Sequence, residues 1–303
     1  MDERTPRILF LGLHGPFSQA PLAALLAADR PVVAVVVPAE AGASEPLRQL
    51  QPPPSPSQLP LLTPYVEADA THLAWAHGLP VFAVRDLAAP ETVQALGALQ
   101  PDVGCVACFP WRLPPSLLAV PAHGFLNLHP SLLPAYRGPH PLFWTFRDGV
   151  QETGVTLHYM NEELDRGDLA LQAPLFLPDG ISGPEADRRA GEIGGQLLVE
   201  ATARLAAGTL PRQPQPAGGH YYPAPVAHDF HLDTGWPARR AFNFMRGTAE
   251  WGHLYQVETN GRSFHLAQAL AYHSRQQLKS AYREAGREIW VQFSPGVLHA
   301  RLG

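Results

Sequence analysis

Residues 102–129 read DVGCVACFPWRLPPSLLAVPAHGFLNLH and contain two apolar runs that decide the expected fold. DVGCVACF (102–109) and GFLNLH (124–129) each have the composition of a buried strand, and the second run ends in polar residues. In open parallel sheets, ligands collect at the carboxyl ends of the strands. Asn127 and His129 therefore lie where chemistry is expected.

Similar runs extend this pattern toward the N-terminus. RILFLGL (7–13), PVVAVVV (31–37) and LPVFAV (79–84) predict three more strands, and helix-like segments are expected at 17–28, 66–78 and near 90–100. Strands that alternate with helices indicate a parallel sheet covered by helices, so the fold class is α/β and Rossmann-like. A long helix is expected at 182–207.

The 303-residue length favours two domains. TLPRQPQPAGG (209–219) has three prolines and two glycines, which is the composition of a linker. We therefore predict a catalytic domain at 1–208, a linker at 209–219, and a small β-rich domain at 220–303. This last domain holds a helix-like segment at 238–247 and alternating segments near 252–258, 263–272 and 288–302. The Pro- and Ser-rich residues 38–64 predict an exposed excursion.

Composition excludes several classes of protein. Hydrophobic residues make up 46% and charged residues 16%, which favours a packed globular chain over a disordered one. The N-terminus lacks the features of a signal peptide, and no apolar stretch approaches the length of a membrane span. Two cysteines cannot build a disulfide framework. These features predict a cytoplasmic protein without a membrane partner.

Charge is divided unevenly along the chain. Residues 1–208 hold 12 basic and 21 acidic side chains, whereas residues 209–303 hold 10 and 6. A cationic C-terminal part can favour an anionic partner such as phosphate or nucleic acid. An excess of four positive charges over this length is better explained as a solvated surface.

Three polar residues are candidates for catalysis. Asn127 and His129 alternate along a strand, so an amide and an imidazole share one face, and Pro130 and Pro134 bracket the turn that follows. Asp165 lies in the polar loop NEELDRGD (161–168) and can orient an imidazole. The structural alternatives are a hydrogen-bonded pair at a strand end and an Asp that stabilises its own turn.

The segment from Phe125 to Gln172 resembles the folate-dependent formyltransferase family. The resemblance rests on five motifs: Asn127-Leu128-His129, the SLLP turn 131–134, Tyr136-Arg137-Gly138, ETGVT (152–156), and Asp165-Arg166-Gly167. The family includes methionyl-tRNA, amino-sugar-nucleotide and glycinamide ribonucleotide formyltransferases. The linker and the β-rich tail are similar to the first two branches only, in which the tail is expected to be an open barrel.

The resemblance implies transfer of a formyl group from the co-substrate 10-formyltetrahydrofolate to a primary amine, without a metal. Such a transfer passes through a tetrahedral intermediate, which needs a donor for the oxyanion and a group that moves protons. Asn127 is implied to hold the formyl oxygen, His129 to act as acid/base or oxyanion partner, and Asp165 to orient or shuttle protons. The implied folate pocket comprises Trp111, Arg112, Leu113, Pro114, Ser131, Leu132, Leu133, Pro134, Asn161 and Leu164.

The acceptor stays open between an amino-sugar nucleotide and methionyl-tRNA, that is, between a small-molecule amine and an aminoacyl-tRNA. Methionyl-tRNA formyltransferases usually carry a basic loop after the second strand, whereas here Arg48 is the only basic residue of 38–64. A net charge of −5 also fits poorly with a phosphate-rich substrate. The alternative is a descendant that binds folate or a nucleotide, or hydrolyses formyltetrahydrofolate, without transferase activity. The sequence does not indicate the oligomeric state.

Other patterns carry weaker signals. Cys105-x-x-Cys108 predicts buried structural cysteines rather than a zinc or redox site, since no second pair exists. The histidines show no ligand spacing, and Gly12-x-x-Gly15 lacks a full dinucleotide motif. The single lysine, Lys279, excludes a P-loop. The three arginines of 239–246 can contact a phosphate, although a solvated helix face is the simpler interpretation.

Overall fold

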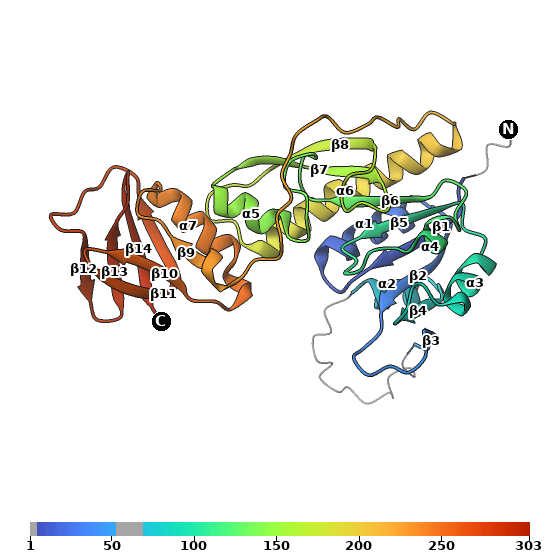
Figure 1. Ribbon diagram of the computed structural model, residues 1–303, viewed down its shortest axis with the longest axis horizontal. Coiled ribbons are helices and arrows are strands. Elements are labelled where there is room, and N and C mark those ends of the chain that lie inside the picture. Colours follow the sequence, from blue (N-terminus) through green and yellow to red (C-terminus); the bar gives the residue numbers. More distant parts are fainter. Residues whose placement is uncertain (1–4, 53–68) are drawn as a thin grey trace. The chain divides into compact units, whose positions relative to one another are not determined.

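The structure is a computed structural model that describes residues 5–52 and 69–303. An eight-stranded sheet has the order β3-β4-β2-β1-β5-β6-β7-β8 (Figure 1). Its strands are β1 (Ile8–Gly12), β2 (Val32–Pro38), β3 (Leu47–Leu50), β4 (Val81–Val84), β5 (Val103–Ala107), β6 (Phe125–His129), β7 (Glu152–Tyr159) and β8 (Leu169–Phe176). The pairs from β4 through β6 are parallel, whereas β3 pairs antiparallel with β4 and β7 pairs antiparallel with β6. The α/β expectation is confirmed.

Helices cover both faces of this sheet. The helices of the chain are α1 (Pro16–Ala27), α2 (Ala70–Ala76), α3 (Pro90–Ala98), α4 (Pro115–Leu118), α5 (Pro141–Asp148), α6 (Gly183–Ala206) and α7 (Ala238–Gly247). On one face, Leu96 of α3 and Leu117 of α4 join a buried cluster with Leu11, Val106 and Phe125. Burying each leucine side chain stabilises the fold by about 1.5–3 kcal/mol.

The other face is covered by α1 and α6. At Gly195 a Cβ atom would lie 2.7 Å from the Cβ of Ala24, so the small residue lets the two helices approach closely. On the sheet itself, side chains alternate between the faces. Because Phe125 packs with α4, Asn127 and His129 lie on the same face as α4.

The chain divides into two compact units that do not follow the sequence in simple order. The first contains Met1–Arg137, Gly154–Ala173 and Asp187–Gly219, and the second contains Gly138–Thr153, Pro174–Ala186 and His220–Gly303. The linker composition predicts domain boundaries at 208 and 220. These boundaries stay a prediction about which parts of the chain fold independently. All candidate catalytic residues belong to the first unit.

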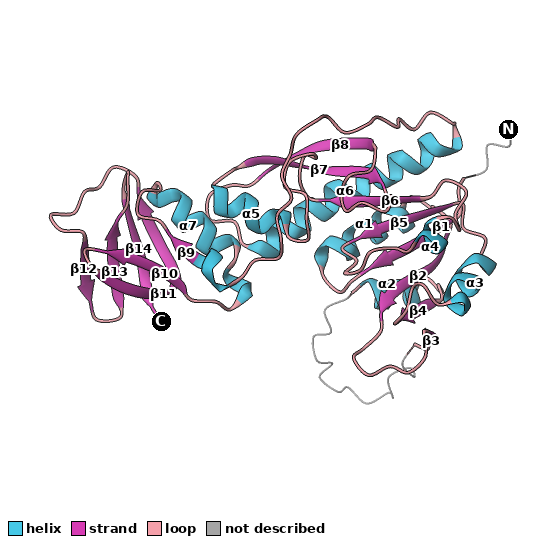
Figure 2. Cartoon of the chain, viewed as in Figure 1, coloured by secondary structure: helices cyan, strands magenta, loops and turns pink. Residues whose placement is uncertain are grey.

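The second unit contains a six-stranded sheet in the order β12-β13-β14-β11-β10-β9 (Figure 2). Its strands are β9 (His231–Leu232), β10 (Tyr255–Thr259), β11 (Arg262–His273), β12 (Tyr282–Ala285), β13 (Glu288–Gln292) and β14 (Val297–Leu302). Helix α7 contacts β11 and β14, and α5 packs on α7. An aromatic core formed by Phe143, Phe230, Phe244 and Tyr255 lies within this unit. The expected β-rich C-terminal part is confirmed.

Three local features differ from the expectations. Leu47–Leu50 forms the edge strand β3 inside the expected excursion, of which residues 53–64 lie outside the described chain. Helix α5 forms at Pro141–Asp148, a stretch for which the sequence patterns predicted no element. Cys105 is buried but Cys108 is exposed, so the expectation of two buried cysteines is wrong for Cys108, which follows the end of β5.

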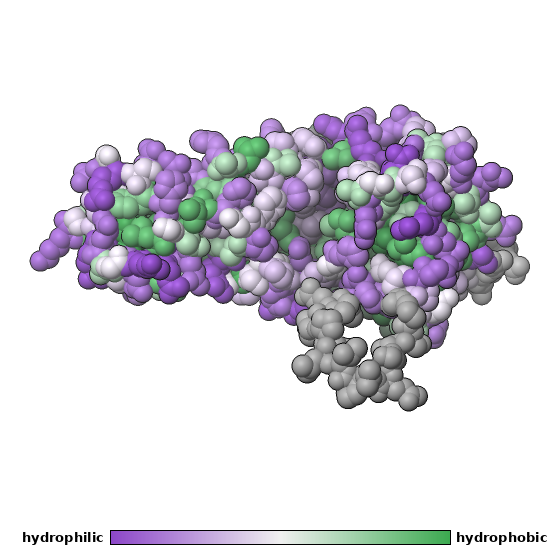
Figure 3. Space-filling model, turned by 90° about the horizontal axis from the view of Figure 1, so that it is seen from below, coloured by the Kyte–Doolittle hydropathy of each residue, from purple (hydrophilic) through white to green (hydrophobic). Residues whose placement is uncertain are grey.

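The surface mixes polar and apolar side chains. On the face drawn in Figure 3, green apolar areas are interspersed with purple polar ones. Among the residues that the structure describes, the large hydrophobic side chains that are exposed come from separate parts of the sequence: Trp111, Leu132, Phe176, Tyr221, Val226 and Leu254. Among residues 5–52 and 69–303, no helix combines the length and the apolar character that crossing a membrane requires.

Candidate active site

The structure brings the three predicted catalytic residues together. His129 Nδ1 lies 3.6 Å from Asp165 Oδ1, and both side chains are largely buried. Asn127 lies two residues earlier on the same strand and the same face. An amide, an imidazole and a carboxylate thus share one corner of the sheet.

Each nitrogen of His129 faces an oxygen. Nε2 donates a hydrogen bond to the carbonyl oxygen of Tyr136 at 2.8 Å, while Nδ1 faces the Asp165 carboxylate. The 3.6 Å separation is longer than a direct hydrogen bond, as is common in catalytic pairs before substrate is bound. Protonated at both nitrogens, the ring would donate on both sides.

His158 is a fourth member of the cluster. The register of the antiparallel pair β6–β7 places His158 opposite Asn127. Its Nε2 accepts a hydrogen bond from Asn127 Nδ2 at 3.0 Å and lies 3.7 Å from Asp165 Oδ1, and its Nδ1 donates to the Tyr159 carbonyl at 3.0 Å. Burial lowers the pKa of His158 to about 4, although the Asp165 charge opposes this shift. His158 is therefore a neutral acceptor at pH 7 that orients the Asn127 amide.

Sequence reasoning missed His158, although a signal existed. The GVTLH segment lies on β7, which runs antiparallel to the FLNLH segment on β6. Once the register of the two strands is known, a polar residue of GVTLH is placed beside Asn127. The register depends on the intervening turn and helix, so the sequence alone did not fix which residue it would be.

The loop that carries Asp165 has an unusual backbone. Asp165 has φ 54°, a left-handed conformation that Asp tolerates better than most residues. At Gly167, a Cβ atom would lie 1.7 Å from the Tyr159 carbonyl oxygen, so only glycine fits. The Asp-x-Gly motif thus has a physical cause: it turns the carboxylate back toward β6.

The SLLP turn is fastened to β7. Leu133 N donates to Thr156 Oγ1 at 3.0 Å, and Thr156 Oγ1 donates to the Ser131 carbonyl at 2.6 Å. Ser131 and Leu133 are buried, whereas Leu132 is 40% exposed. The turn therefore continues β6 in a fixed direction beyond His129.

A cavity of about 510 Å³ opens at the carboxyl ends of β4 and β5. Four predicted folate-site residues, Trp111 to Pro114, lie in its wall. The remaining lining residues are Arg85, Asp86, Leu87, Ala88, Pro115 and Glu162. Its size is within the range of small-molecule sites, and its place is the one expected for ligands of a parallel sheet.

The other predicted folate-site residues lie elsewhere. Ser131 to Pro134, Asn161 and Leu164 do not line this cavity, and their contact with folate stays a prediction. Glu162 does line it and belongs to the loop that carries Asp165. Sequence reasoning missed the Arg85–Ala88 segment, because the cavity is formed by loops that are distant in sequence.

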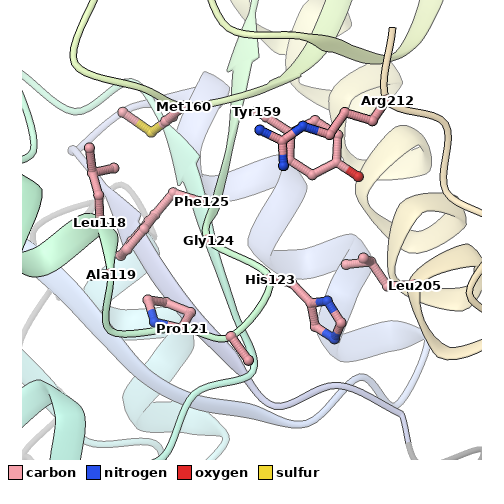
Figure 4. A pocket seen from close by; sticks show the side chains of 11 residues that line it. Leu118, Ala119, Pro121, His123, Gly124, Phe125, Tyr159, Met160, Leu205 and Arg212 are labelled. Carbon is pink, nitrogen blue, oxygen red and sulfur yellow. The ribbon is translucent and has the colours of Figure 1, made fainter. Parts of the chain in front are cut away.

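A second cavity, of about 480 Å³, lies at the opposite, amino end of β6. Figure 4 shows Leu118, Phe125 and Met160 on one side, and Tyr159 with Arg212 stacked over its ring on the other. His123 and Leu205 are also part of the wall. None of Asn127, His129, His158 or Asp165 lines this cavity.

Two further expectations concern metals and phosphate. Within the part of the chain that the structure describes, no group of three or more His, Cys, Asp or Glu side chains is arranged to hold a metal ion. The arginines of α7 have partners within their own unit: Arg239 pairs with Asp179, Arg240 with Asp148, and Arg246 donates to the Gly180 carbonyl. This arrangement supports a structural role for the helix-face arginines.

Comparisons with known proteins identify the family of the chain. A family model described as formyl transferase matches residues 7–202. Methionyl-tRNA formyltransferase of Symbiobacterium thermophilum is 35% identical over 259 residues, covering 84% of this chain and 74% of the relative. The same enzyme of Moorella thermoacetica is 33% identical over 299 residues, covering 98% and 88%.

A solved structure shares the fold over nearly the whole chain. An N-formyltransferase from Helicobacter canadensis, in complex with folinic acid and dTDP-3-aminofucose, matches with a TM-score of 0.64 at 13% identity. The match covers 97% of this chain and 98% of that one. The family model and the two relatives show that the chain belongs to the formyltransferase family.

Proposed function

We propose that the protein transfers the formyl group of 10-formyltetrahydrofolate to the primary amine of methionyl-tRNA. As a family member it is a formyltransferase, and one feature of the site supports the folate donor. The loop Asn161–Asp168 supplies Glu162 to the cavity beside β5 and Asp165 to the catalytic cluster. A donor bound in the cavity would thus have its reactive end beside the carboxylate.

Asn127 is proposed to stabilise charge on the formyl oxygen. One N–H of its amide is bonded to His158, which fixes the plane of the amide and leaves the second N–H for the substrate. A fixed donor is effective because it needs no reorganisation when charge develops. His158 therefore acts through Asn127 and is proposed as a positioning residue.

Asp165 and His129 are proposed to move the proton. As the amine attacks, a bond forms between its nitrogen and the formyl carbon, and the bond from that carbon to the folate nitrogen breaks. The amine loses a proton and the departing folate nitrogen gains one. The carboxylate and the imidazole, 3.6 Å apart, are placed to accept and return that proton.

Sequence similarity favours methionyl-tRNA as the acceptor. The Moorella relative matches over 98% of this chain, so the similarity includes the second unit and not only the catalytic one. This acceptor also places the enzyme in the cytoplasm, where aminoacyl-tRNA is used in protein synthesis.

An amino-sugar nucleotide is the second candidate acceptor. It is favoured by the net charge of −5 and by residues 38–52, in which Arg48 is the one basic side chain. Recognition of a tRNA backbone ordinarily needs several Lys or Arg contacts. The descendant without transferase activity is not proposed, because the relatives described above are transferases.

The test is the turnover of 10-formyltetrahydrofolate by the purified protein, followed optically as tetrahydrofolate forms. Methionyl-tRNA and a panel of amino-sugar nucleotides are supplied separately, with uncharged tRNA as the control. Turnover that requires methionyl-tRNA supports the proposal. Turnover with a sugar nucleotide but not with methionyl-tRNA would show that the acceptor is the sugar nucleotide. The absence of turnover with every acceptor contradicts the transferase function.

A further inference from the structure

The carboxamide of Gln215 connects two segments of the catalytic site. Its Nε2 donates to the carbonyl oxygens of Asp165 at 2.8 Å and of Gly167 at 2.9 Å. Its Oε1 accepts from the Arg137 guanidinium, at 2.7 Å from Nη2 and 3.2 Å from Nε. The donor and acceptor capacity of the side chain is thus used on two different loops.

Those two loops hold the partners of His129. The Asp165 loop presents the carboxylate to Nδ1, and Tyr136, which precedes Arg137, presents its carbonyl to Nε2. Asp165 and Tyr136 both have left-handed backbones, with φ 54° and 56°. Such conformations are unfavourable for residues other than glycine and persist only where surrounding contacts impose them. The bonds of Gln215 are contacts of that kind.

The other residues of the segment 212–218, to which Gln215 belongs, also contact the Asp165 loop and its neighbours. Arg212 lies over the Tyr159 ring (Figure 4), 4.6 Å from its centroid. Its Nε donates to Asp168 at 2.9 Å. The main chains of Gln213 and Leu169 exchange two hydrogen bonds, at 2.7 and 3.0 Å. Arg137, which is buried, also donates from Nη1 to the Gly218 carbonyl at 3.0 Å. Residues 212–218 therefore run beside the Asp165 loop and hold both of its ends.

We propose that Gln215 is a positioning residue for formyl transfer, which fixes the distance between Asp165 and His129 from outside the site. This inference rests on the proposed role of Asp165. The segment 212–218 then has a task besides joining the two parts of the chain, since it aligns the carboxylate with the imidazole.

The experiment compares Gln215→Met with Gln213→Met. The first change keeps the length of the side chain and removes its hydrogen bonds. The second makes the same replacement two residues earlier, where the side chain is exposed and the loop is held by main-chain bonds. We expect Gln215→Met to lower kcat by about tenfold to a hundredfold, with KM for the folate within about twofold, because a displacement of about 1 Å in a catalytic group can cost that much. Gln213→Met is expected to keep the wild-type kcat.

A second variant separates the two ends of the carboxamide. Gln215→Glu keeps an acceptor for Arg137 but places a carboxylate against two carbonyl oxygens, so it is expected to lower kcat at least as much as Gln215→Met. The pH at which kcat reaches half of its maximum should also move in both variants, which a loss of folded protein alone would not produce. Thermal unfolding and folate binding are measured on the same variants. If Gln215→Met does not fold, the test uses Gln215→Glu.

Two results would overturn the inference in distinguishable ways. If Asp165→Asn is inactive while both Gln215 variants match Gln213→Met in kcat and pH profile, Gln215 is not a positioning residue. If Asp165→Asn itself transfers formyl at the wild-type rate, the role of Asp165 fails and the inference fails with it.

Discussion

The catalytic cluster and the neighbouring cavity differ in how they are built. Asn127, His129 and His158 lie on adjacent strands, where the register of β6 and β7 fixes their separation. The cavity is lined instead by loop residues that follow β4, β5 and β7, and Trp111 in its wall is 40% exposed. We propose that the chemistry relies mainly on these strands and the binding of folate on the loops, which are the more variable parts of a fold. Changes in the two regions should accordingly have different kinetic effects.

The largest effect is expected from His129→Ala. The change removes the imidazole that faces Asp165 and leaves the cavity residues in place. We expect kcat to fall by about a thousandfold, within the range ordinarily lost with a general acid or base. KM for the folate should change by less than about threefold. A steady-state comparison with wild type measures both constants, and a loss that appears mainly in KM would contradict the division between the two regions.

Asn127→Ala is expected to have the next largest effect. Removal of a fixed donor to a developing oxyanion typically costs about a hundredfold to a thousandfold in kcat. Asn127→Asp is the informative partner variant, since it keeps the size of the side chain and replaces the donor with an acceptor. Both variants should be comparably slow in a stopped-flow assay. A near-normal rate for Asn127→Asp would show that the amide does not bind the formyl oxygen.

Trp111→Ala tests the other side of the comparison. The side chain lies in the cavity wall and packs edge-to-face on Phe109, with ring centroids 5.7 Å apart. Loss of an aromatic contact worth about 0.5–1.5 kcal/mol should raise KM for the folate by about threefold to tenfold and leave kcat within twofold. Phe176→Ala, an exposed aromatic residue that does not line the cavity, is the control and should leave KM unchanged. An equal change of KM in both variants would show that the cavity does not bind the folate.

The smallest effect concerns stability and pH. His158 has a folded-state pKa of about 4, below its ordinary value of 6.5, because burial disfavours its charge. The unfolded chain therefore binds more protons between these values, and the free energy of unfolding should fall as pH is lowered from about 6.5 toward 4. His158→Gln should make that dependence shallower, as measured by urea unfolding at several pH values. His265→Gln, at an exposed position on β11, is the control and should keep the wild-type slope.

The same contrast explains what could be predicted from the sequence. The strand runs and the alternation of Asn127 and His129 are local patterns, and they identified the sheet and two members of the cluster. His158 depends on strand register, and the wall from Arg85 to Ala88 depends on loops meeting in space. Gln215 looked like part of a linker, because a polar residue between prolines carries no local signal of the two loops it joins. The sequence patterns predicted no helix at residues 141–148, where α5 packs on α7.

The central claim is that the cluster on β6 and the loop carrying Asp165 perform the transfer, and single-turnover measurement on Asp165→Asn tests it most directly. Enzyme in excess over 10-formyltetrahydrofolate is mixed with saturating acceptor, and folate affinity is measured separately on the same protein. We predict unchanged folate binding, within about twofold, with the transfer step slowed by about a hundredfold or more. Transfer at the wild-type rate by a variant that binds folate normally would contradict the account.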